Sequence, residues 1–238
     1  MPKVAVHRLP TGSVPIDRLL KGGLPKGGIL LVYGEAGAGK TSLAIQCAVT
    51  AGRRGWATFF IDADGCLPAE RLRQIAAGCL DEVAQLIYIF SPSNFYEQTA
   101  LLETLDRLTA GRRGLLVVDS ISRLYRLEIT NLEQAVVLSK ELNRQLAYIT
   151  NTVKSCGIPA LLTSHVRKVP ADDLLDERVE PVAARALRYW ATDIIHLKPS
   201  AAPNVKLALL EKYGGKVQLQ PPFCYVRLTE RGLEGIDS

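Results

Sequence analysis

Residues 34–41, which read G-E-A-G-A-G-K-T, constrain the fold of this chain more than any other stretch. They match the pattern G-x-x-x-x-G-K-[ST] of phosphate-binding loops, in which backbone N–H groups surround phosphate oxygens at the positive end of a helix. An apolar run over residues 29–33 precedes the motif and predicts a buried strand, and residues 42–47 follow it with helical spacing. Because strand, glycine-rich loop and helix form the context that the motif requires, we predict a P-loop nucleotide-binding core.

Each position of this motif has a chemical role. Lys40 is expected to reach the β- and γ-phosphates of ATP, and the Thr41 hydroxyl is expected to hold Mg²⁺. The alternative is a glycine-rich turn before a helix, with Lys40 solvated. The predicted nucleotide-binding residues of the loop and of the first helical turn are Gly34, Glu35, Ala36, Gly37, Ala38, Gly39, Lys40, Thr41 and Ser42.

Length and composition limit the classes of protein that remain. The chain has 238 residues, 47% of them apolar and 22% charged, which suits one large globular α/β domain. No apolar run approaches the roughly 20 residues of a membrane span and no signal peptide opens the chain, so we expect a cytoplasmic protein without membrane contact. The five cysteines are scattered and form no C-x-x-C pair, which predicts neither a disulfide framework nor zinc.

The positive charge is concentrated at the start of the chain. The net charge is +5, and residues 1–28 account for +4 of it. A basic edge of this kind can contact phosphates or an acidic partner, although solvated cations are the more common explanation. The charged residues of this segment are Lys3, Arg8, Arg18, Lys21 and Lys26, with Asp17 as the only acidic one.

Alternating apolar strands and helices over residues 28–165 predict a doubly wound, mainly parallel α/β sheet. Short separations between the last strands predict antiparallel pairing near the C-terminus. A long polar loop is expected over residues 166–181. The expected helices are 13–20, 40–52, 68–77, 95–108 and 132–155, and the expected strands are 29–33, 56–62, 86–90, 115–119, 158–165, 193–197, 205–211 and 224–228.

Polar or turn residues follow four of the expected strands. Asp119 ends the strand L-L-V-V-D, the Walker B pattern in which the carboxylate orders the Mg²⁺ shell beside the phosphate loop. Gly34, Asp64, Ser120 and His165 lie at strand ends of the same kind. Since a doubly wound sheet binds its ligand beyond the carboxyl ends of its strands, we expect these four positions to meet at one site.

Three further stretches resemble the RecA/RadA recombinase family, most closely its short archaeal paralogues. They are F-I-D-A-D-G with P-A-E-R-L at residues 60–65 and 68–72, V-D-S-I-S-R-L-Y-R at 118–126, and L-T-E-R-G-L-E at 228–234. The resemblance runs from residue 11 to the end of the chain. It implies a single RecA-like ATPase core over residues 1–238, without the N-terminal DNA-binding domain that full-length RadA-type recombinases carry.

The resemblance implies roles for three more side chains. Asp64 occupies the position of a family glutamate that orients the attacking water; it is one methylene shorter, and a displacement near 1 Å can cost about a hundredfold in rate. His165 stands where the family usually has a glutamine that senses the γ-phosphate, although it could simply be satisfied at a strand end. Arg71 matches a position that packs on the adenine; the alternative is a surface arginine. The expected catalytic residues are therefore Lys40, Asp64, Asp119 and His165, with Thr41 and Asp119 at the metal.

The same resemblance places a DNA-contacting loop at residues 166–190. The segment carries five basic residues (Arg167, Lys168, Arg178, Arg185, Arg188) and five acidic ones (Asp172, Asp173, Asp176, Glu177, Glu180). Because this balance is neutral, we expect modest, salt-dependent DNA affinity. The better candidates for contact are Arg185, Arg188 and Tyr189, together with Trp190; the alternative for the two aromatic rings is packing in the core.

The leading hypothesis is a DNA-binding accessory protein of homologous recombination and DNA repair that binds ATP and Mg²⁺ and hydrolyses ATP weakly. The Phe-x-x-Ala peptide that joins RadA-type filaments is not expected ahead of the core, because the first phenylalanine is Phe59. The implied partners are single-stranded or branched DNA without strong sequence preference, a RadA-type recombinase and a Holliday-junction resolvase. Two alternatives stay open: a DNA-stimulated strand-exchange recombinase, and a nucleotide-gated scaffold ATPase that does not bind DNA.

Overall fold

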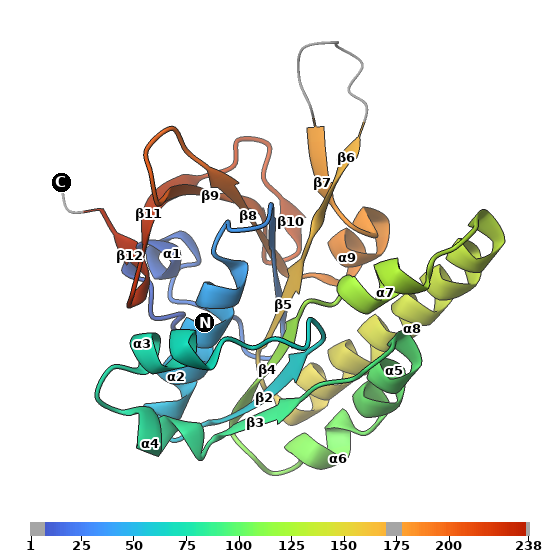
Figure 1. Ribbon diagram of the computed structural model, residues 1–238, viewed down its shortest axis with the longest axis horizontal. Helices are drawn as coiled ribbons and strands as arrows, with labels where there is room; N and C mark the ends of the chain where they lie inside the picture. The colour runs from blue at the N-terminus through green and yellow to red at the C-terminus, as the bar shows by residue number, and fades with distance from the viewer. Residues whose placement is uncertain (1–7, 170–177, 237–238) are drawn as a thin grey trace, which may run out of the picture.

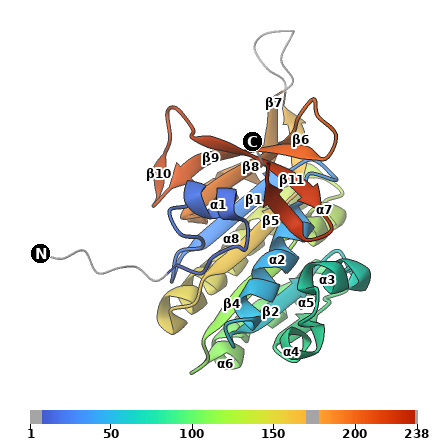
Figure 2. The same cartoon turned by 90° about the vertical axis from the view of Figure 1, so that its left-hand side faces the viewer.

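The computed structural model describes residues 8–169 and 178–236. Within these ranges, one ten-stranded sheet lies between two layers of helices (Figures 1 and 2). The strand order is β12-β11-β9-β8-β1-β5-β4-β2-β3, and β10 pairs with β9. The strands of this sheet are β1 Ile29–Gly34, β2 Ala57–Asp62, β3 Ile87–Phe90, β4 Gly114–Asp119, β5 Ala160–Ser164, β8 Asp193–Pro199, β9 Val205–Tyr213, β10 Lys216–Val217, β11 Phe223–Thr229 and β12 Gly232–Gly235.

The strands from β8 to β3 are parallel, as the continuous apolar runs predict. β1 pairs in parallel with both β5 and β8, and β4 lies between β5 and β2 in the same direction. Every residue of β1, β2, β4 and β5 is buried, because helices cover both faces. The carboxyl ends of these four strands therefore meet at one edge, which confirms the doubly wound arrangement.

Two groups of helices form the two covering layers. Helices α1 Val14–Leu19, α2 Lys40–Gly52, α3 Ala69–Ala76 and α4 Leu80–Ala84 pack on one face. The other face is covered by α5 Phe95–Glu103, α6 Leu105–Thr109, α7 Arg123–Glu128, α8 Leu132–Cys156 and α9 Ala184–Trp190. Along β1, Leu30 and Val32 point to the first layer and Leu31 to the second, since strand side chains alternate. None of the described helices is long and apolar enough to cross a membrane.

Local signals delimit the longest helix, α8. The Asn131 side chain accepts a hydrogen bond from the Gln134 backbone N–H at 2.9 Å and so caps the first turn. Gly157 follows the last turn in the left-handed region, with φ +64°, where a residue without a Cβ is preferred. The chain itself thus specifies both ends of this helix.

The C-terminal strands turn the sheet antiparallel, as expected. β8 is parallel to β1 on one side and antiparallel to β9 on the other. β9 pairs with β11, and β11 with β12, both antiparallel. Helix α1 packs against β11 and β12 of this extension (Figure 1).

Two local expectations were wrong. The helix expected over residues 95–108 breaks at Thr104, whose hydroxyl donates to Leu101 O at 2.8 Å; a side chain that bonds its own backbone competes with helix continuation. The expected loop over residues 166–181 holds a two-stranded antiparallel ribbon, β6 Val166–Val169 with β7 Arg178–Pro181. Valines at 166, 169 and 179 favour strand conformation there. The remainder of that loop lies outside the described residues.

Candidate nucleotide-binding site

The loop between β1 and α2 has the backbone geometry of a phosphate cradle. Gly39 precedes the helix at φ +97°, and no side chain caps the first helical turn. The N–H groups of that turn are consequently free to meet an anion at the positive end of the helix. At the start of the loop, a Cβ on Gly34 would lie 2.2 Å from Leu197 O, so only glycine fits against β8.

Lys40 lies folded over the mouth of this loop. Its Nζ donates to Gly34 O at 2.9 Å and to Glu35 O at 2.8 Å, and the residue is 7% exposed. Burial lowers the pKa of Lys40, and the nearby carboxylates of Asp119 and Asp64 oppose that shift. A buried cation that is bonded only to neutral carbonyls fits a phosphate better than it fits bulk protein, so the residues present suit a bound nucleotide.

Asp119 ends β4 next to the loop, where the Walker B pattern predicted it. The Thr163 hydroxyl on the adjoining strand β5 donates a hydrogen bond to Asp119 Oδ1. Burial raises the pKa of Asp119, and hydrogen bonds from Thr163 and Thr41 oppose that shift. Because the Thr41 side chain acts on this carboxylate, the two expected magnesium ligands lie close together.

A second carboxylate, Asp64, lies at the end of β2 and contacts three donors. The Ser120 hydroxyl donates to Asp64 Oδ1 at 3.2 Å, Arg123 Nε lies 3.8 Å from the same oxygen, and His165 Nε2 lies 3.5 Å from Oδ2. Burial by itself raises the pKa of Asp64, but the hydrogen bond and charge of His165 act against it. With Arg123 and Ser120 contributing as well, the pKa of Asp64 falls below its ordinary value. This carboxylate is a weaker proton acceptor than an isolated one.

The strand ends that the sequence predicted to meet do lie together. Backbone hydrogen bonds connect the ends of β2, β4 and β5 at one edge of the sheet. Ala63 N donates to Asp119 O at 2.9 Å, and Ile121 N donates to Thr163 O at 3.1 Å. Sequence reasoning missed Thr163 and Arg123, which contact the two carboxylates. The only sequence signal for Thr163 is a polar residue two positions before His165 on a strand, which points to the same face.

Arg71 on α3 bridges two sides of the site. Its guanidinium donates to Ser42 Oγ at 3.1 Å, to Thr229 O at 2.6 Å and to Glu230 O at 3.2 Å. These contacts tie α3 and the turn after β11 to the first turn of α2. The residue lies at the rim of the phosphate loop, and its packing against adenine stays a prediction.

A groove of about 880 Å³ runs between α7, the first half of α8, the ribbon strand β6 and α9. Arg126, Arg167, Arg185 and Tyr189 contribute to its lining. Tyr189 is 75% exposed, so the alternative that its ring packs in the core is wrong for Tyr189. The partly buried Trp190 ring does pack against the core, and its Nε1 donates to Asn143 Oδ1 at 3.1 Å. Arg126 was missed because α7 brings it from a separate part of the chain, and Arg167 was counted in the expected DNA-contacting loop but was not among the better candidates.

The third expected DNA contact, the half-buried Arg188, is engaged by other side chains of the fold. Its Nη1 donates to Glu211 Oε2 at 2.8 Å, and its Nη2 donates to the Tyr33 hydroxyl at 3.2 Å. The Glu211 carboxylate also accepts from Tyr33 at 2.6 Å. Arg188 does not line the groove. We therefore leave it out of the proposed DNA surface, because an internal carboxylate holds its guanidinium.

The parallel sheet, the glycine loop that opens α2, and Thr41 of α2 beside Asp119 at the end of β4 define a P-loop fold of RecA type. A profile of the Rad51 family matches residues 3–201, most of the chain. The chain belongs to the Rad51 family and, within it, to the archaeal RadB group of DNA repair and recombination proteins.

Individual relatives support this assignment. The chain is 36% identical over 215 residues to the DNA repair and recombination protein RadB of Methanothermobacter thermautotrophicus, spanning 89% of this chain and 90% of that protein. It is 33% identical over 232 residues to RadB of Thermococcus kodakarensis, spanning 96% and 100%. A solved structure described as that of the RadB recombinase superposes with a TM-score of 0.77 at 28% identity, covering 96% of this chain and all of that one. The resemblance to short archaeal recombinase paralogues is confirmed.

Proposed function

We propose that this chain binds ATP with Mg²⁺, hydrolyses it slowly, and binds DNA as an accessory to a RadA-type recombinase in recombinational repair. One observation carries the slow hydrolysis: the carboxylate expected to orient the attacking water, Asp64, is short and is engaged by His165, Ser120 and Arg123. The low pKa that results makes it a poor acceptor of the water's proton.

The roles of the side chains follow from their positions. Mg²⁺, when bound, neutralises charge that develops on the β- and γ-phosphate oxygens. Thr41 and Asp119 would hold the ion. Lys40 would exchange its two carbonyl partners for phosphate oxygens, and the uncapped N–H groups of α2 would fix the phosphate position. Asp64 would orient water, and His165 would set the position of that carboxylate.

Steady-state ATP hydrolysis by wild type and Asp64→Glu, each with and without single-stranded DNA, tests the chemistry. We expect wild type to bind ATP with slow turnover, and Asp64→Glu to turn over faster because its carboxylate reaches further toward the γ-phosphate. Asp106→Glu on α6, an exposed site far from the loop, is the matched control and should change nothing. Fast, DNA-stimulated turnover by wild type would favour the strand-exchange recombinase instead.

The groove between α7 and α9 is the proposed DNA surface. Arg126 and Arg185 have no carboxylate partner among the residues described, and Tyr189 presents an exposed ring beside them. Cations with an exposed aromatic suit a single strand, whose phosphates and bases they contact together. Arg185→Ala should weaken binding of a labelled oligothymidine several-fold and flatten its salt dependence. Arg107→Ala, exposed on α6, is the control and should bind as wild type does. Equal affinity of wild type and Arg185→Ala would exclude this groove as the DNA surface, and no binding by wild type even at low salt would favour a scaffold that does not bind DNA.

The remaining parts of the proposal concern location and partners. We place the protein in the cytoplasm as one RecA-like core, with a RadA-type recombinase and a Holliday-junction resolvase as partners, on the basis of the family. Size-exclusion chromatography of the chain with purified RadA, with and without ATP, tests the first partnership. Separate elution under both conditions would count against an accessory role.

A further inference from the structure

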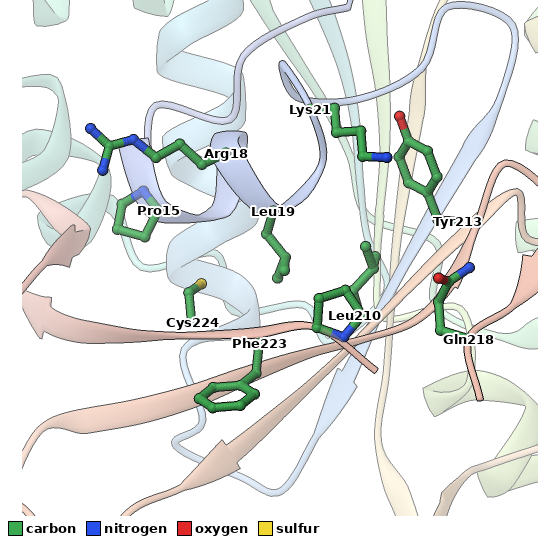
Figure 3. Close-up of a pocket in the computed structure, with 10 residues that line it drawn as sticks. Pro15, Arg18, Leu19, Lys21, Leu210, Tyr213, Gln218, Phe223 and Cys224 are labelled. Atoms are coloured by element: carbon green, nitrogen blue, oxygen red, sulfur yellow. The ribbon is translucent and has the colours of Figure 1, made fainter. Parts of the chain in front are cut away.

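The groove between α7 and α9, which we call the α9 groove, lies on the face of the sheet covered by the second helix layer. A second hollow lies in the first layer, between α1 and strands β9 and β11. It has a volume of about 430 Å³, within the roughly 300 to 1,000 Å³ of small binding pockets. Leu19 of α1 faces Leu210 of β9 across it, and Cys224 of β11 and the Tyr213 ring close its two sides (Figure 3). We call this hollow the α1 groove. Its inner surface is largely apolar.

Positive side chains stand at both ends of the α1 groove. Arg18 extends at one end and Lys21 at the other (Figure 3). Lys21 Nζ lies 4.8 Å from the centroid of the Tyr213 ring, which keeps it beside the groove. Over the described ranges, neither Arg18 nor Lys21 has a carboxylate within ion-pair distance, and the groove lining contains no acidic residue. The end charges are thus uncompensated.

The only acidic residue nearby in the chain is committed elsewhere. Asp17 on α1 accepts hydrogen bonds from the Thr11 backbone N–H at 2.7 Å and from the Thr11 hydroxyl at 2.8 Å. It therefore braces the turn before α1 and does not face the groove. Two of the cations that give residues 1–28 their net positive charge, Arg18 and Lys21, thus stand at the two ends of an apolar hollow.

We propose that the α1 groove binds an extended acidic segment of a partner protein, with one or two apolar side chains seated between Leu19 and Leu210 and carboxylates meeting Arg18 and Lys21. This is independent of nucleotide and DNA binding. The charge excludes the chain's own residues 1–7 as the natural occupant, because they contain Lys3 and no acidic residue. Nucleic acid fits less well, since Arg18 and Lys21 are the only cations among the described residues of the groove lining and offer few phosphate contacts.

A short fluorescein-labelled peptide, with a leucine and a phenylalanine at its centre and only aspartate and glutamate on either side, is the probe. Binding to the full chain is measured by fluorescence anisotropy without nucleotide. We expect saturable binding that is lost when serines replace the two apolar residues, because the anchor supplies the buried contact. We also expect it to weaken when lysines replace the acidic residues. Failure of the acidic probe to bind would overturn the proposal.

The double variant Arg18→Glu/Lys21→Glu locates the site. Both side chains are exposed and without ion-pair partners in the described part of the chain, so the fold should tolerate reversal. We expect the probe to bind at least about tenfold more weakly, because attraction becomes repulsion at both ends. Lys26→Glu, exposed in the same segment but outside the groove, should bind as wild type does.

The affinity of the double variant for the probe, its affinity for single-stranded DNA and its sedimentation velocity distinguish the acidic peptide from other occupants of the α1 groove. Equal probe affinity for wild type and the double variant would place the peptide elsewhere and refute the assignment. A matching loss of single-stranded DNA affinity in the double variant would assign the groove to nucleic acid instead. Sedimentation velocity that shows a wild-type dimer and a monomeric double variant would assign it to a second copy of the chain. Either result would overturn the peptide proposal.

Discussion

Glu211 joins three elements behind the phosphate loop, and its replacement by glutamine gives a quantitative test of what holds them. Its carboxylate on β9 accepts from the Tyr33 hydroxyl on β1 at 2.6 Å and from Arg188 Nη1 on α9 at 2.8 Å. His196 Nδ1 on β8 lies 3.5 Å away, and the His196 ring stacks on that of Tyr33 at 4.2 Å between centroids. Glutamine keeps the shape, but it removes the charge and turns one acceptor into a donor that faces other donors.

The pKa of Glu211 gives the size of the stabilisation that its ionised carboxylate provides. Burial raises this pKa, but hydrogen bonds from His196 and Tyr33 and the charge of Arg188 outweigh it and bring the pKa from 4.5 to about 2. Since one pKa unit corresponds to about 1.4 kcal/mol, the ionised carboxylate contributes on the order of 3 kcal/mol to folding. The folded pKa lies below the unfolded one, so this contribution is fully present above about pH 4.5 and is lost as the pH falls toward 2.

Urea unfolding of wild type and Glu211→Gln at pH 7 and pH 3 measures the contribution of this carboxylate to the free energy of unfolding. We expect the variant to be less stable by about 3 kcal/mol at pH 7, and by less than half as much at pH 3, where the wild-type carboxylate is losing its advantage. Glu230→Gln, on the exposed turn after β11, is the matched control and should stay within about 0.5 kcal/mol of wild type. A loss below about 1 kcal/mol at pH 7, or an equal loss at both pH values, would refute the account of this cluster.

Three smaller changes test other parts of the fold and site. Gly39→Ala places a side chain at φ +97°, with its Cβ 3.2 Å from Leu233 Cδ2; it should cost about 1 to 3 kcal/mol in urea unfolding and abolish binding of a fluorescent ATP analogue. Asn131→Ala removes the cap of α8 and should lower the free energy of unfolding by about 1 kcal/mol; an unchanged urea midpoint would contradict this. Thr163→Val keeps the shape of a fully buried side chain but removes the hydrogen bond to Asp119, which should cost about 1.5 to 3 kcal/mol by the same measurement.

Much of the fold follows from local chemistry along the chain. Residues 34–41 require a strand, a glycine turn and a helix in that order, because only that backbone leaves its N–H groups free for phosphate. Continuous apolar strands require helices on both faces, and the short links after residue 190 require antiparallel pairing. The ribbon at residues 166–169 and 178–181 was not predicted because each strand has only four residues, and Arg167 and Lys168 stand next to each other, so no alternation of apolar and polar side chains marks the first strand.

Some residues of the nucleotide-binding site could likewise be predicted from the sequence, and others could not. Lys40, Thr41 and Asp119 could be assigned from sequence, since each belongs to a motif whose spacing fixes its position relative to the phosphate. Strand order could not be read from those motifs, and it is strand order that brings Thr163 to Asp119 and His165 to Asp64.

Arg188 shows most clearly what the sequence alone could not predict. In sequence it stands beside Arg185 and Tyr189, and nothing local separates the three; in the fold, one helical face directs Arg185 and Tyr189 to the α9 groove. Arg188 instead meets Glu211, 23 residues further along the chain, and Tyr33, 155 residues earlier. Composition and motif spacing determined which chemistry this protein carries. Only the tertiary structure decided which charges face solvent and which compensate one another inside, because that depends on contacts between residues far apart in sequence.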